Sequence, residues 1–422
     1  MPPLTIAQAS CADDYDPDSM PVAKARAFIH QFLEPLKGVL RVPVRSALGR
    51  VLAGDVISPV DVPSHRNSAM DGWAMRGADL ASDTPAVLAE IGTAFAGKPF
   101  AGTVGPGQCV RIMTGGVVPE GADTVVMQER AQASGKSITF APGQKTGQNV
   151  RQGGEDLRAG SIALRRGRIV RPAELGLIAS LGIGEVAVYR PLRVAFFSTG
   201  DELKSIGSAL GEGEIYDSNR YTLHGMLTRL GCEPLDMGVV RDDPRLIERA
   251  FREAAANADV VITSGGVSVG EADFVKGILG ELGEVVFWKI AMKPGRPLAY
   301  GKLGGAHFFG LPGNPVSVMV TFYQFVRDAL LVLSGASPVE PVPTFSATCT
   351  TRLKKAPGRT EFQRGVLTRG PDGTLSVRPT GEQGSGILKS MSEANCFIIL
   401  GDATGNVEPG AAVEVQLLEG IV

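Results

Sequence analysis

The sequence lacks the residues on which several common kinds of site depend. Its four histidines are scattered and form no zinc-binding pair, no Ser-His-Asp signature is present, and no Walker-type G-x-x-x-x-G-K-[ST] loop occurs. The cysteines are equally uninformative, because no two of them show C-x-x-C spacing and neither a structural zinc site nor a disulfide framework is indicated. They are Cys11, Cys109, Cys232, Cys349 and Cys396. We expect reduced thiols, as in a cytoplasm.

The chain also lacks a charge excess and a long apolar segment. Its 42 Lys and Arg against 44 Asp and Glu give a formal net charge of −2, without a basic block. This argues against nucleic acid or an anionic membrane surface as the main partner. No uninterrupted apolar run reaches about 18 residues, and no basic segment followed by an apolar core opens the chain. We therefore expect a soluble, cytoplasmic protein that acts on a small molecule.

Changes in composition predict several domains, since 422 residues exceed one ordinary core. Residues 1–60 and 150–191 are expected to form a discontinuous N-terminal domain that contains helices. Between them, 61–149 is rich in Gly, Pro, Val and Thr and predicts a small inserted β domain. Residues 192–340 predict an α/β domain. Short strands and turns in 341–422 predict a terminal β-barrel or sandwich.

The α/β domain has the clearest pattern, because strand and helix signals alternate along it. This predicts βαβ units in a doubly wound, mostly parallel sheet with helices on both faces. Asp243-Pro244 has the residue types of a helix N-cap and first turn, and another helix is expected from Asn314-Pro315 to about Leu333. The strand candidates are 193–197, 234–240, 260–262 and 285–290, with a further pair between 298 and 309.

Chemically distinctive residues follow the carboxyl ends of these strands, where open parallel sheets place their ligand crevices. One strand leads into Ser264-Gly265-Gly266, whose consecutive N–H groups could face an anion, and then to Asp273. Glu202 and Asp242 follow two other strands. Three carboxylates converging on one crevice suit a Mg²⁺-type ion that bridges phosphate oxygens. The alternatives are a plain tight turn and solvated surface carboxylates.

Two further segments suit anion binding at the same crevice. Lys289, Lys293 and Arg296 lie between an apolar strand and a Pro/Gly turn, and such cations can hold phosphates or a tetrahedral oxyanion. The loop from Pro312 to Pro315 would aim a helix N-terminus at the crevice. Solvated lysines and a simple proline-capped helix start are the structural alternatives.

The inserted domain carries its own polar segment, 61–75, which is too polar for a core strand. Asp71 precedes Gly72, so it is either a turn residue or a carboxylate delivered across a domain or subunit interface. Residues 111–116 and 151–156 show the same mixture of Gly and Arg with polar or acidic residues.

Taken together, seven segments closely resemble the molybdopterin molybdotransferase family, which includes the E domain of gephyrin. They are Asn67–Gly72, Arg111–Gly115, Gly154–Asp156, Ser198–Glu202, Thr263–Phe274, Met292–Gly295 and Leu311–Pro315. The resemblance covers roughly residues 20 to 420, in order. Two positions depart from it: Trp73 stands where a smaller aromatic residue is expected, and Arg296 where lysine is common.

The resemblance implies the last step of molybdenum cofactor assembly, in which molybdate enters adenylylated molybdopterin with Mg²⁺ and AMP is released. It implies an elongated homodimer, joined through the N-terminal domain. Each active site would lie between the α/β domain of one subunit and the inserted domain of the other. A molybdopterin adenylyltransferase and molybdoenzymes are the implied partners.

The resemblance also implies roles for individual residues. The implied metal ligands are Asp242, Asp273 and Glu202, and the implied catalytic residues are these three with Lys289, Lys293 and Asp71. The implied substrate-binding residues are Thr114, Arg151, Asp156, Ser264, Gly265, Gly266, Arg296, Pro312, Pro315 and Ser385. Two other functions remain open: a related pterin-adenylylating enzyme, which would consume ATP, and a scaffold with a decayed catalytic site.

Overall fold

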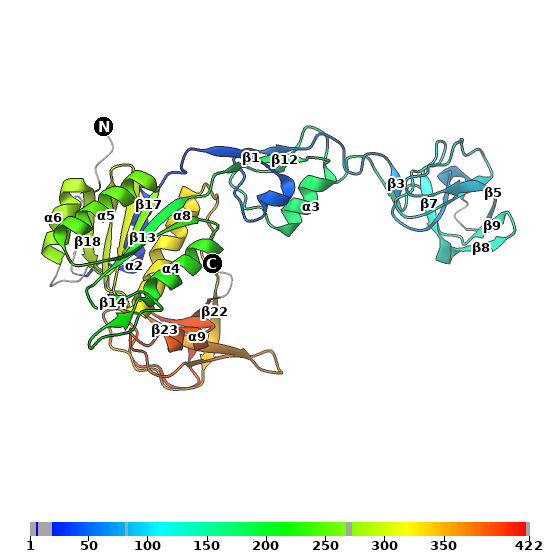
Figure 1. The fold of residues 1–422 in the computed structure, drawn as a ribbon. Coiled ribbons are helices and arrows are strands. Elements are labelled where there is room, and N and C mark those ends of the chain that lie inside the picture. The colour runs from blue at the N-terminus through cyan, green and yellow to red at the C-terminus, as the bar shows by residue number, and fades with distance from the viewer. Residues whose placement is uncertain (1–5, 7–18, 81–82, 267–271, 419–422) are drawn as a thin grey trace, which may run out of the picture.

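The computed structural model describes residue 6 and residues 19–80, 83–266 and 272–418, with the side chains of 272–274 outside that description. The described chain is elongated (Figure 1). A large α/β sheet and a β-barrel lie together at one end, a small region around one helix lies in the middle, and a separate β-sheet lies at the other end.

The α/β sheet has six strands in the order β16-β13-β17-β21-β20-β18. They are β16 (Glu233–Val240), β13 (Arg193–Thr199), β17 (Val260–Ser264), β21 (Ala306–Leu311), β20 (Pro297–Leu303) and β18 (Gly283–Lys289). The first four are parallel, and β20 pairs antiparallel with both of its neighbours, so the mostly parallel sheet that the sequence predicts is confirmed. The reversal occurs at Gly304-Gly305, where a two-residue connection joins β20 to β21 as a hairpin.

Helices cover both faces of this sheet, because neighbouring strand residues point to opposite sides. Phe196 packs in the core beneath α4 (Ser218–Arg229), whereas the next residue, Phe197, packs in the core beneath α5 (Pro244–Asn257) and α6 (Ala272–Leu282). Asp243 caps α5 as expected, with Oδ1 accepting from the amides of the first turn.

One helix differs from the predicted domain division. The sequence groups α2 (Val22–His30) with the N-terminal domain, but its Phe28 packs edge-on against Trp288 of β18, with ring centroids 5.0 Å apart. The helix therefore belongs to the core of the α/β sheet.

A continuous helical stretch forms the centre of this core. It consists of α7 (Pro315–Thr321), a π-helical turn η4 (Phe322–Val326) and α8 (Arg327–Leu333). Among the described residues this is the one helical stretch long and apolar enough to cross a membrane, with a mean hydropathy of 1.5. Its most apolar part is 72% buried against the rest of the chain, as in a core helix.

The C-terminal residues close into a five-stranded barrel, as predicted. Its strands are β23 (Thr360–Arg369), β24 (Leu375–Pro379), β22 (Thr344–Cys349), β26 (Ala412–Leu417) and β25 (Cys396–Leu400), and β23 pairs with β25 to complete it. A short strand of the α/β region, β19 (Met292–Lys293), runs along β23 and ties the barrel to the sheet. The helix α9 (Lys389–Glu393) lies between β24 and β25 in the chain.

The middle region joins segments that are distant in the sequence. It pairs β1 (Val39–Pro43) with β12 (Glu185–Tyr189) and β2 (Val56–Ile57) with β11 (Ile162–Leu164), around η1 (Val44–Ala47) and α3 (Pro172–Ser180). Its apolar core includes Leu52, Ile178 and Val188. This region connects the α/β sheet to the sheet at the far end (Figure 1).

The far sheet, here called the distal sheet, has the order β7-β4-β6-β5-β9-β8. Its strands are β4 (Gly72–Met75), β5 (Ala86–Ala94), β6 (Gln108–Ile112), β7 (Thr124–Met127), β8 (Ala131–Ser134) and β9 (Ser137–Phe140), with short turns η2 (Gly77–Asp79) and η3 (Gln128–Arg130). A separate pair, β3 (Asn67–Ser68) with β10 (Val150–Arg151), lies where the chain enters and leaves this sheet.

Candidate functional site

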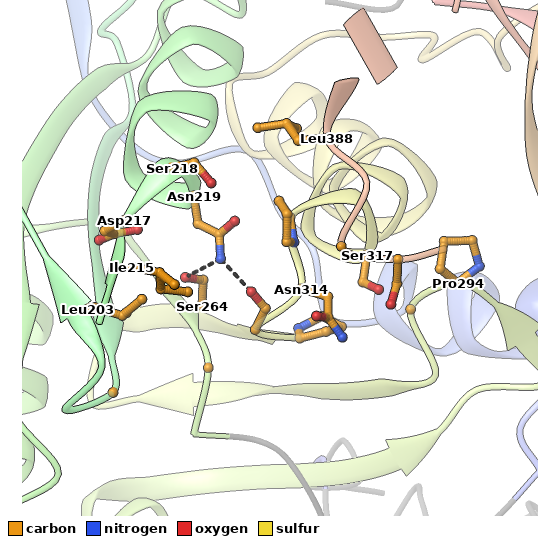
Figure 2. Close-up of a pocket in the computed structure, with 18 of the residues that line it drawn as sticks. Leu203, Ile215, Asp217, Ser218, Asn219, Ser264, Pro294, Asn314, Ser317 and Leu388 are labelled. Atoms are coloured by element: carbon orange, nitrogen blue, oxygen red, sulfur yellow. Dashed lines mark hydrogen bonds between the residues drawn. The ribbon is translucent and has the colours of Figure 1, made fainter. Parts of the chain in front are cut away.

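A cavity of about 1020 Å³ opens at the carboxyl ends of four strands of the α/β sheet, where the sequence predicts the crevice. The loops that follow β13, β16, β17 and β21 all contribute to its wall, and a loop of the barrel, residues 383–388, closes one side (Figure 2). Ten of the predicted site residues line it: Glu202, Asp242, Ser264, Gly265, Gly266, Lys293, Arg296, Pro312, Pro315 and Ser385.

Five other predicted site residues lie outside the described lining of this cavity, and the side chain of Asp273 lies outside the described residues. Lys289 ends β18, outside the cavity wall, and Asp273 lies in the first turn of α6 with its side chain outside the described part of the structure. The remaining four, Asp71, Thr114, Arg151 and Asp156, lie in or beside the distal sheet, at the opposite end of the chain from the cavity.

The glycine loop after β17 is shaped by close packing on the end of the neighbouring strand β13. Gly265 has φ +90°, and a Cβ there would lie 2.7 Å from the carbonyl oxygen of Thr199. Gly266 has φ +69°, and its Cβ would lie 3.0 Å from Thr199 Oγ1. Both positions therefore require glycine. The Ser264 hydroxyl is held by the hydroxyl of Ser198, 2.9 Å away.

One expectation for this loop is wrong. The N–H of Gly265 donates to the carbonyl oxygen of Leu311 at 3.1 Å, so it is part of the link between β17 and β21. It does not turn toward a bound anion together with the next amide. Within its described residues, 264–266, the loop contributes its shape and the Ser264 side chain, and the Gly265 amide is already used.

Two carboxylates stand at the mouth of the cavity. Glu202 folds back over its own loop, since a Cβ on Gly200 would lie 2.5 Å from Glu202 Oε2. The backbone N–H of Asp242 donates to Asp201 Oδ1 at 3.3 Å, which joins the two loops. No cluster of three or more potential metal ligands occurs among the described residues. Mg²⁺ commonly uses one or two protein carboxylates and takes its other ligands from phosphates and water, so Glu202 with Asp242 fits such an ion.

Cations lie on the side of the cavity that the barrel covers. Lys293 is on β19, and its Nζ lies 3.4 Å from Oε1 of the buried Glu361 on β23. The second oxygen of Glu361 accepts from Gln363 Nε2 at 2.9 Å. The lysine side chain is still 49% exposed, so its charge faces the cavity while the barrel anchors it. Arg296 lines the same side.

The start of α7 lines the cavity, as the sequence predicts, but its first available amide is used by the barrel loop. Pro315 has no N–H, and the N–H of Val316 donates to the backbone oxygen of Ser385 at 3.1 Å. The helix start therefore binds the barrel loop. Ser385 reaches the cavity through this contact, which explains how a residue of the barrel becomes part of the wall.

The barrel loop is positioned by Arg364, a residue that the sequence analysis does not single out. Arg364 is 1% exposed, and its NH2 donates to the carbonyl oxygens of Gly384 at 2.9 Å and Glu382 at 3.4 Å. Its backbone N–H donates to Gln383 Oε1. Burial lowers the pKa of the guanidinium to about 10. Arg364 thus holds the backbone on both sides of Gln383 next to the cavity.

Three polar residues of the wall were also missed, because each has an ordinary explanation in the sequence. Asp217 and Asn219 begin α4, and Thr199 ends β13. All three are buried, and each keeps a side-chain oxygen without a hydrogen-bond partner among the described residues: Asp217 Oδ2, Asn219 Oδ1 and Thr199 Oγ1. Buried polar atoms normally have partners, so these atoms mark a place for a ligand.

The distal residues form a compact group of their own. Asp71 Oδ1 accepts from both the N–H and the hydroxyl of Thr114, each at 2.7 Å. The hydrogen bonds from Thr114, first the backbone N–H and then the hydroxyl, lower the pKa of Asp71. Arg151 pairs with Asn67 in the ladder, while the N–H of Asp156 donates to Val62. Two of the family-like segments, Asn67–Gly72 and Arg111–Gly115, therefore meet beside the distal sheet.

Trp73, the aromatic departure from the family pattern, has a structural role in the distal sheet. It is 4% exposed, its Nε1 donates to Glu90 at 2.8 Å, and the guanidinium of Arg111 lies 4.2 Å from the ring centroid. The larger ring is thus accommodated by the sheet.

The geometry defines a multidomain protein with a polar cavity on an open α/β sheet, lined by both carboxylate and cationic side chains. Three family models match it in order: the MoeA N-terminal region (domain I and II) at residues 20–182, a probable molybdopterin binding domain at 195–331, and the MoeA C-terminal region (domain IV) at 346–418. The chain belongs to the MoeA family.

Relatives and solved structures agree over nearly the whole chain. A molybdopterin molybdenumtransferase of Haemophilus influenzae is 47% identical over 88% of this chain and 92% of its own length. One of Bacillus subtilis is 35% identical over 89% of both chains. The crystal structure of the molybdopterin biosynthesis moeA protein from Pyrococcus horikoshii OT3 superposes with a TM-score of 0.82 at 29% identity, covering 95% of this chain and all of that one.

Proposed function

We propose that this protein is a molybdopterin molybdenumtransferase, an enzyme that inserts molybdate into adenylylated molybdopterin with Mg²⁺-dependent release of AMP. The observation that carries the proposal is the two-signed cavity, which has carboxylates at its mouth and cations on the barrel side. An anionic substrate with a metal counter-ion needs both. The family membership and the names of the relatives from H. influenzae and B. subtilis supply the reaction.

Glu202 and Asp242 would hold the Mg²⁺ ion, with Asp273 as a further ligand. When bound, the ion would neutralise charge on the phosphoanhydride as AMP leaves. Ser264 also lines the cavity, and its hydroxyl would donate to a phosphate oxygen. Gly265 and Gly266, which let the loop pack on Thr199, would keep Ser264 in place beside the phosphate.

Lys293 would bind molybdate, a tetrahedral dianion, with Lys289 and Arg296 as further cationic residues. Its ammonium group pairs with Glu361, but the side chain remains half-exposed. Lys293 can therefore move from Glu361 to molybdate without its charge being desolvated and unpaired. Pro312, Pro315 and Ser385 would shape the wall around it. Molybdate held here would be placed to attack the anhydride, which couples loss of AMP to metal insertion.

A second copy of the chain would complete the site. Asp71, Thr114, Arg151 and Asp156 lie at the opposite end of the chain from the cavity, so within one elongated chain they do not meet it. We propose a homodimer in which the distal sheet of one subunit faces the cavity of the other. Apolar side chains exposed on the middle region support an interface there: Val39, Leu40, Leu48, Ile57 and Val60.

The cellular setting follows from the same proposal. The enzyme would act in the cytoplasm, take its substrate from a molybdopterin adenylyltransferase, and pass the finished cofactor to molybdoenzymes.

The deciding measurement is release of AMP from adenylylated molybdopterin by the purified protein with Mg²⁺, with and without molybdate. Asp242→Asn and Asp273→Asn should lose molybdate-dependent release. The matched control is Asp243→Asn, because this neighbouring carboxylate caps α5 and does not line the cavity. AMP release at the same rate without molybdate would rule out the coupling. Consumption of ATP would indicate an adenylylating enzyme, and binding without any release would indicate a scaffold.

A further inference from the structure

The wall of the cavity at the start of α4 differs chemically from the wall beneath the barrel. Here the buried polar atoms without partners include two that can only accept hydrogen bonds, Asp217 Oδ2 and Asn219 Oδ1. Asp217 is 1% exposed and Asn219 is 6% exposed, and both line the cavity. Water or a ligand must supply donors to them, because buried acceptors without donors are costly.

The orientation of the Asn219 amide is fixed by its neighbours. Its Nδ2 donates to the backbone oxygen of Gly313 at 2.7 Å and lies 3.3 Å from Ser264 Oγ. Since a carbonyl oxygen can only accept, the nitrogen must be the atom that faces Gly313. Figure 2 shows both bonds on the nitrogen side, with the amide oxygen on the other side. That oxygen is therefore a buried acceptor in the cavity wall, without a partner among the described residues.

Asp217 is fixed in a similar way. One oxygen, Oδ1, accepts from the N–H of Arg220 as the N-cap of α4, at 3.3 Å. The other, Oδ2, lies 3.9 Å from Arg220 Nε, near enough for charge attraction but without a hydrogen bond. The arginine itself is directed to Asp236, which holds its Nε at 2.7 Å. The charge of Asp217 is thus balanced while its second oxygen stays available.

These acceptors exclude the anionic parts of the substrate from this wall, because phosphate and molybdate oxygens are acceptors too. Molybdate belongs near Lys293 and Arg296, and the phosphates belong near Ser264, on the side of Asn219 that its amide nitrogen faces. A neutral group that carries N–H donors belongs at the start of α4. Under the proposed function two groups qualify, the pterin and the adenine of the adenylylated substrate.

We infer that Asp217 and Asn219 accept hydrogen bonds from the amino and ring N–H groups of the pterin, and so determine specificity for that end of the substrate. This inference rests on the proposed function. The pterin edge carries a 2-amino group next to a ring N–H, so it offers adjacent donors and no acceptor between them. Adenine sets its amino group beside ring nitrogens that accept. The oxygens of Asp217 and Asn219 that lack partners can only accept hydrogen bonds, so they match the adjacent donors of the pterin edge.

Two variants change the acceptors in different ways. Asp217→Asn keeps an oxygen for the N-cap and turns the free atom into a donor. Asn219→Leu removes the acceptor at similar volume. Asp243→Asn is the matched control, since it makes the same chemical change at the N-cap of α5, outside the cavity. Thermal unfolding of each variant establishes that it is folded.

The probes are 6-hydroxymethylpterin, the corresponding lumazine, in which an oxygen replaces the 2-amino group, and AMP, each titrated calorimetrically into the intact protein. The wild type should bind the pterin at least about 10-fold more tightly than the lumazine. Asp217→Asn should abolish or invert this preference, and Asn219→Leu should weaken pterin binding by about 10-fold or more. AMP binding by both variants, and every affinity of Asp243→Asn, should be unchanged.

Other results overturn the inference. They are failure of the wild type to prefer the pterin, an unchanged preference in both variants, and a loss of AMP affinity in place of pterin affinity, which would put the adenosine at this wall. Molybdate-dependent AMP release by the wild type is measured in the same preparation. If that release is present, only the placement of the pterin has failed; if it is absent, the proposed function has failed.

Discussion

Replacing Gly265 by alanine tests whether the glycine loop is shaped by close packing. Two costs are expected. The φ of +90° is unfavourable for any residue with a Cβ, by about 1–2 kcal/mol. The new Cβ would also lie 2.7 Å from the Thr199 carbonyl oxygen, and relieving such overpacking costs about 1–3 kcal/mol more. Because that oxygen belongs to the backbone of β13, the loop must move.

Gly410→Ala separates the two costs. Gly410 has φ +89° in a turn of the barrel, and nothing lies within 4 Å of its Cβ position. Gly410→Ala should therefore be destabilised by the backbone conformation alone. Denaturant unfolding in a Trp73→Phe background lets the buried Trp288 report on the α/β sheet for Gly265→Ala, while circular dichroism follows the barrel variant. We expect Gly265→Ala to lose about 2–5 kcal/mol and Gly410→Ala about 1–2 kcal/mol.

The functional result should differ in the same direction. Movement of Ser264 and Gly266 away from the cavity floor should lower molybdate-dependent AMP release at least about 10-fold in Gly265→Ala, since small displacements of positioning groups are expensive. Gly410→Ala should release AMP normally. Equal losses of stability in the two variants, together with full activity of Gly265→Ala, would refute the argument that the loop requires this close approach.

Three further predictions concern single side chains. Arg364→Met should speed amide hydrogen exchange in residues 382–386 and lower activity, while Arg364→Lys restores the charge without restoring the loop; unchanged exchange would show that the loop is held otherwise. Lys293→Ala should raise the molybdate concentration needed for half-maximal AMP release about 10-fold or more, and Glu361→Gln should change it less, because the cation remains. The hydrogen bond from the Arg171 side chain lowers the pKa of Glu174 to about 2. At pH 7, Glu174→Gln should therefore lower the unfolding free energy of the middle region by about 1–3 kcal/mol. A carboxylate with a depressed pKa stabilises above its unfolded pKa of about 4.5, so this difference should fade as the pH drops toward 2; a constant difference from pH 7 to pH 2 would contradict it.

The parts of the fold that local sequence encodes could be predicted. Two of the parallel strands, β13 and β17, contain continuous apolar runs, and the Asp243-Pro244 cap marks the start of α5 within a residue. The turn at 371–373 joins antiparallel β23 and β24 as its Pro-Asp-Gly sequence suggests. These features depend on neighbours in the chain, which the sequence displays directly.

The features that were missed depend on contacts between distant segments. Asp217 has the sequence of an ordinary helix cap, and only tertiary packing buries its second oxygen. The bond from Gly265 to Leu311 joins residues 46 positions apart, and it removes an amide that the local pattern offers to a ligand. The sequence likewise predicts helices in the N-terminal domain without saying that α2 meets Trp288 of the α/β sheet.

The polarity of the cavity connects these observations. Each cation on the barrel side is delivered by a segment that also joins the barrel to the α/β sheet, as Lys293 is by β19 and Glu361. The acceptor wall, in contrast, is built entirely within the α/β region, from the ends of β13 and the start of α4. Removing or loosening the barrel should therefore weaken binding of anions and leave the acceptor wall intact. The acceptor wall thus depends on the α/β region alone, whereas Lys293 of the same region depends also on Glu361 of the barrel to hold it.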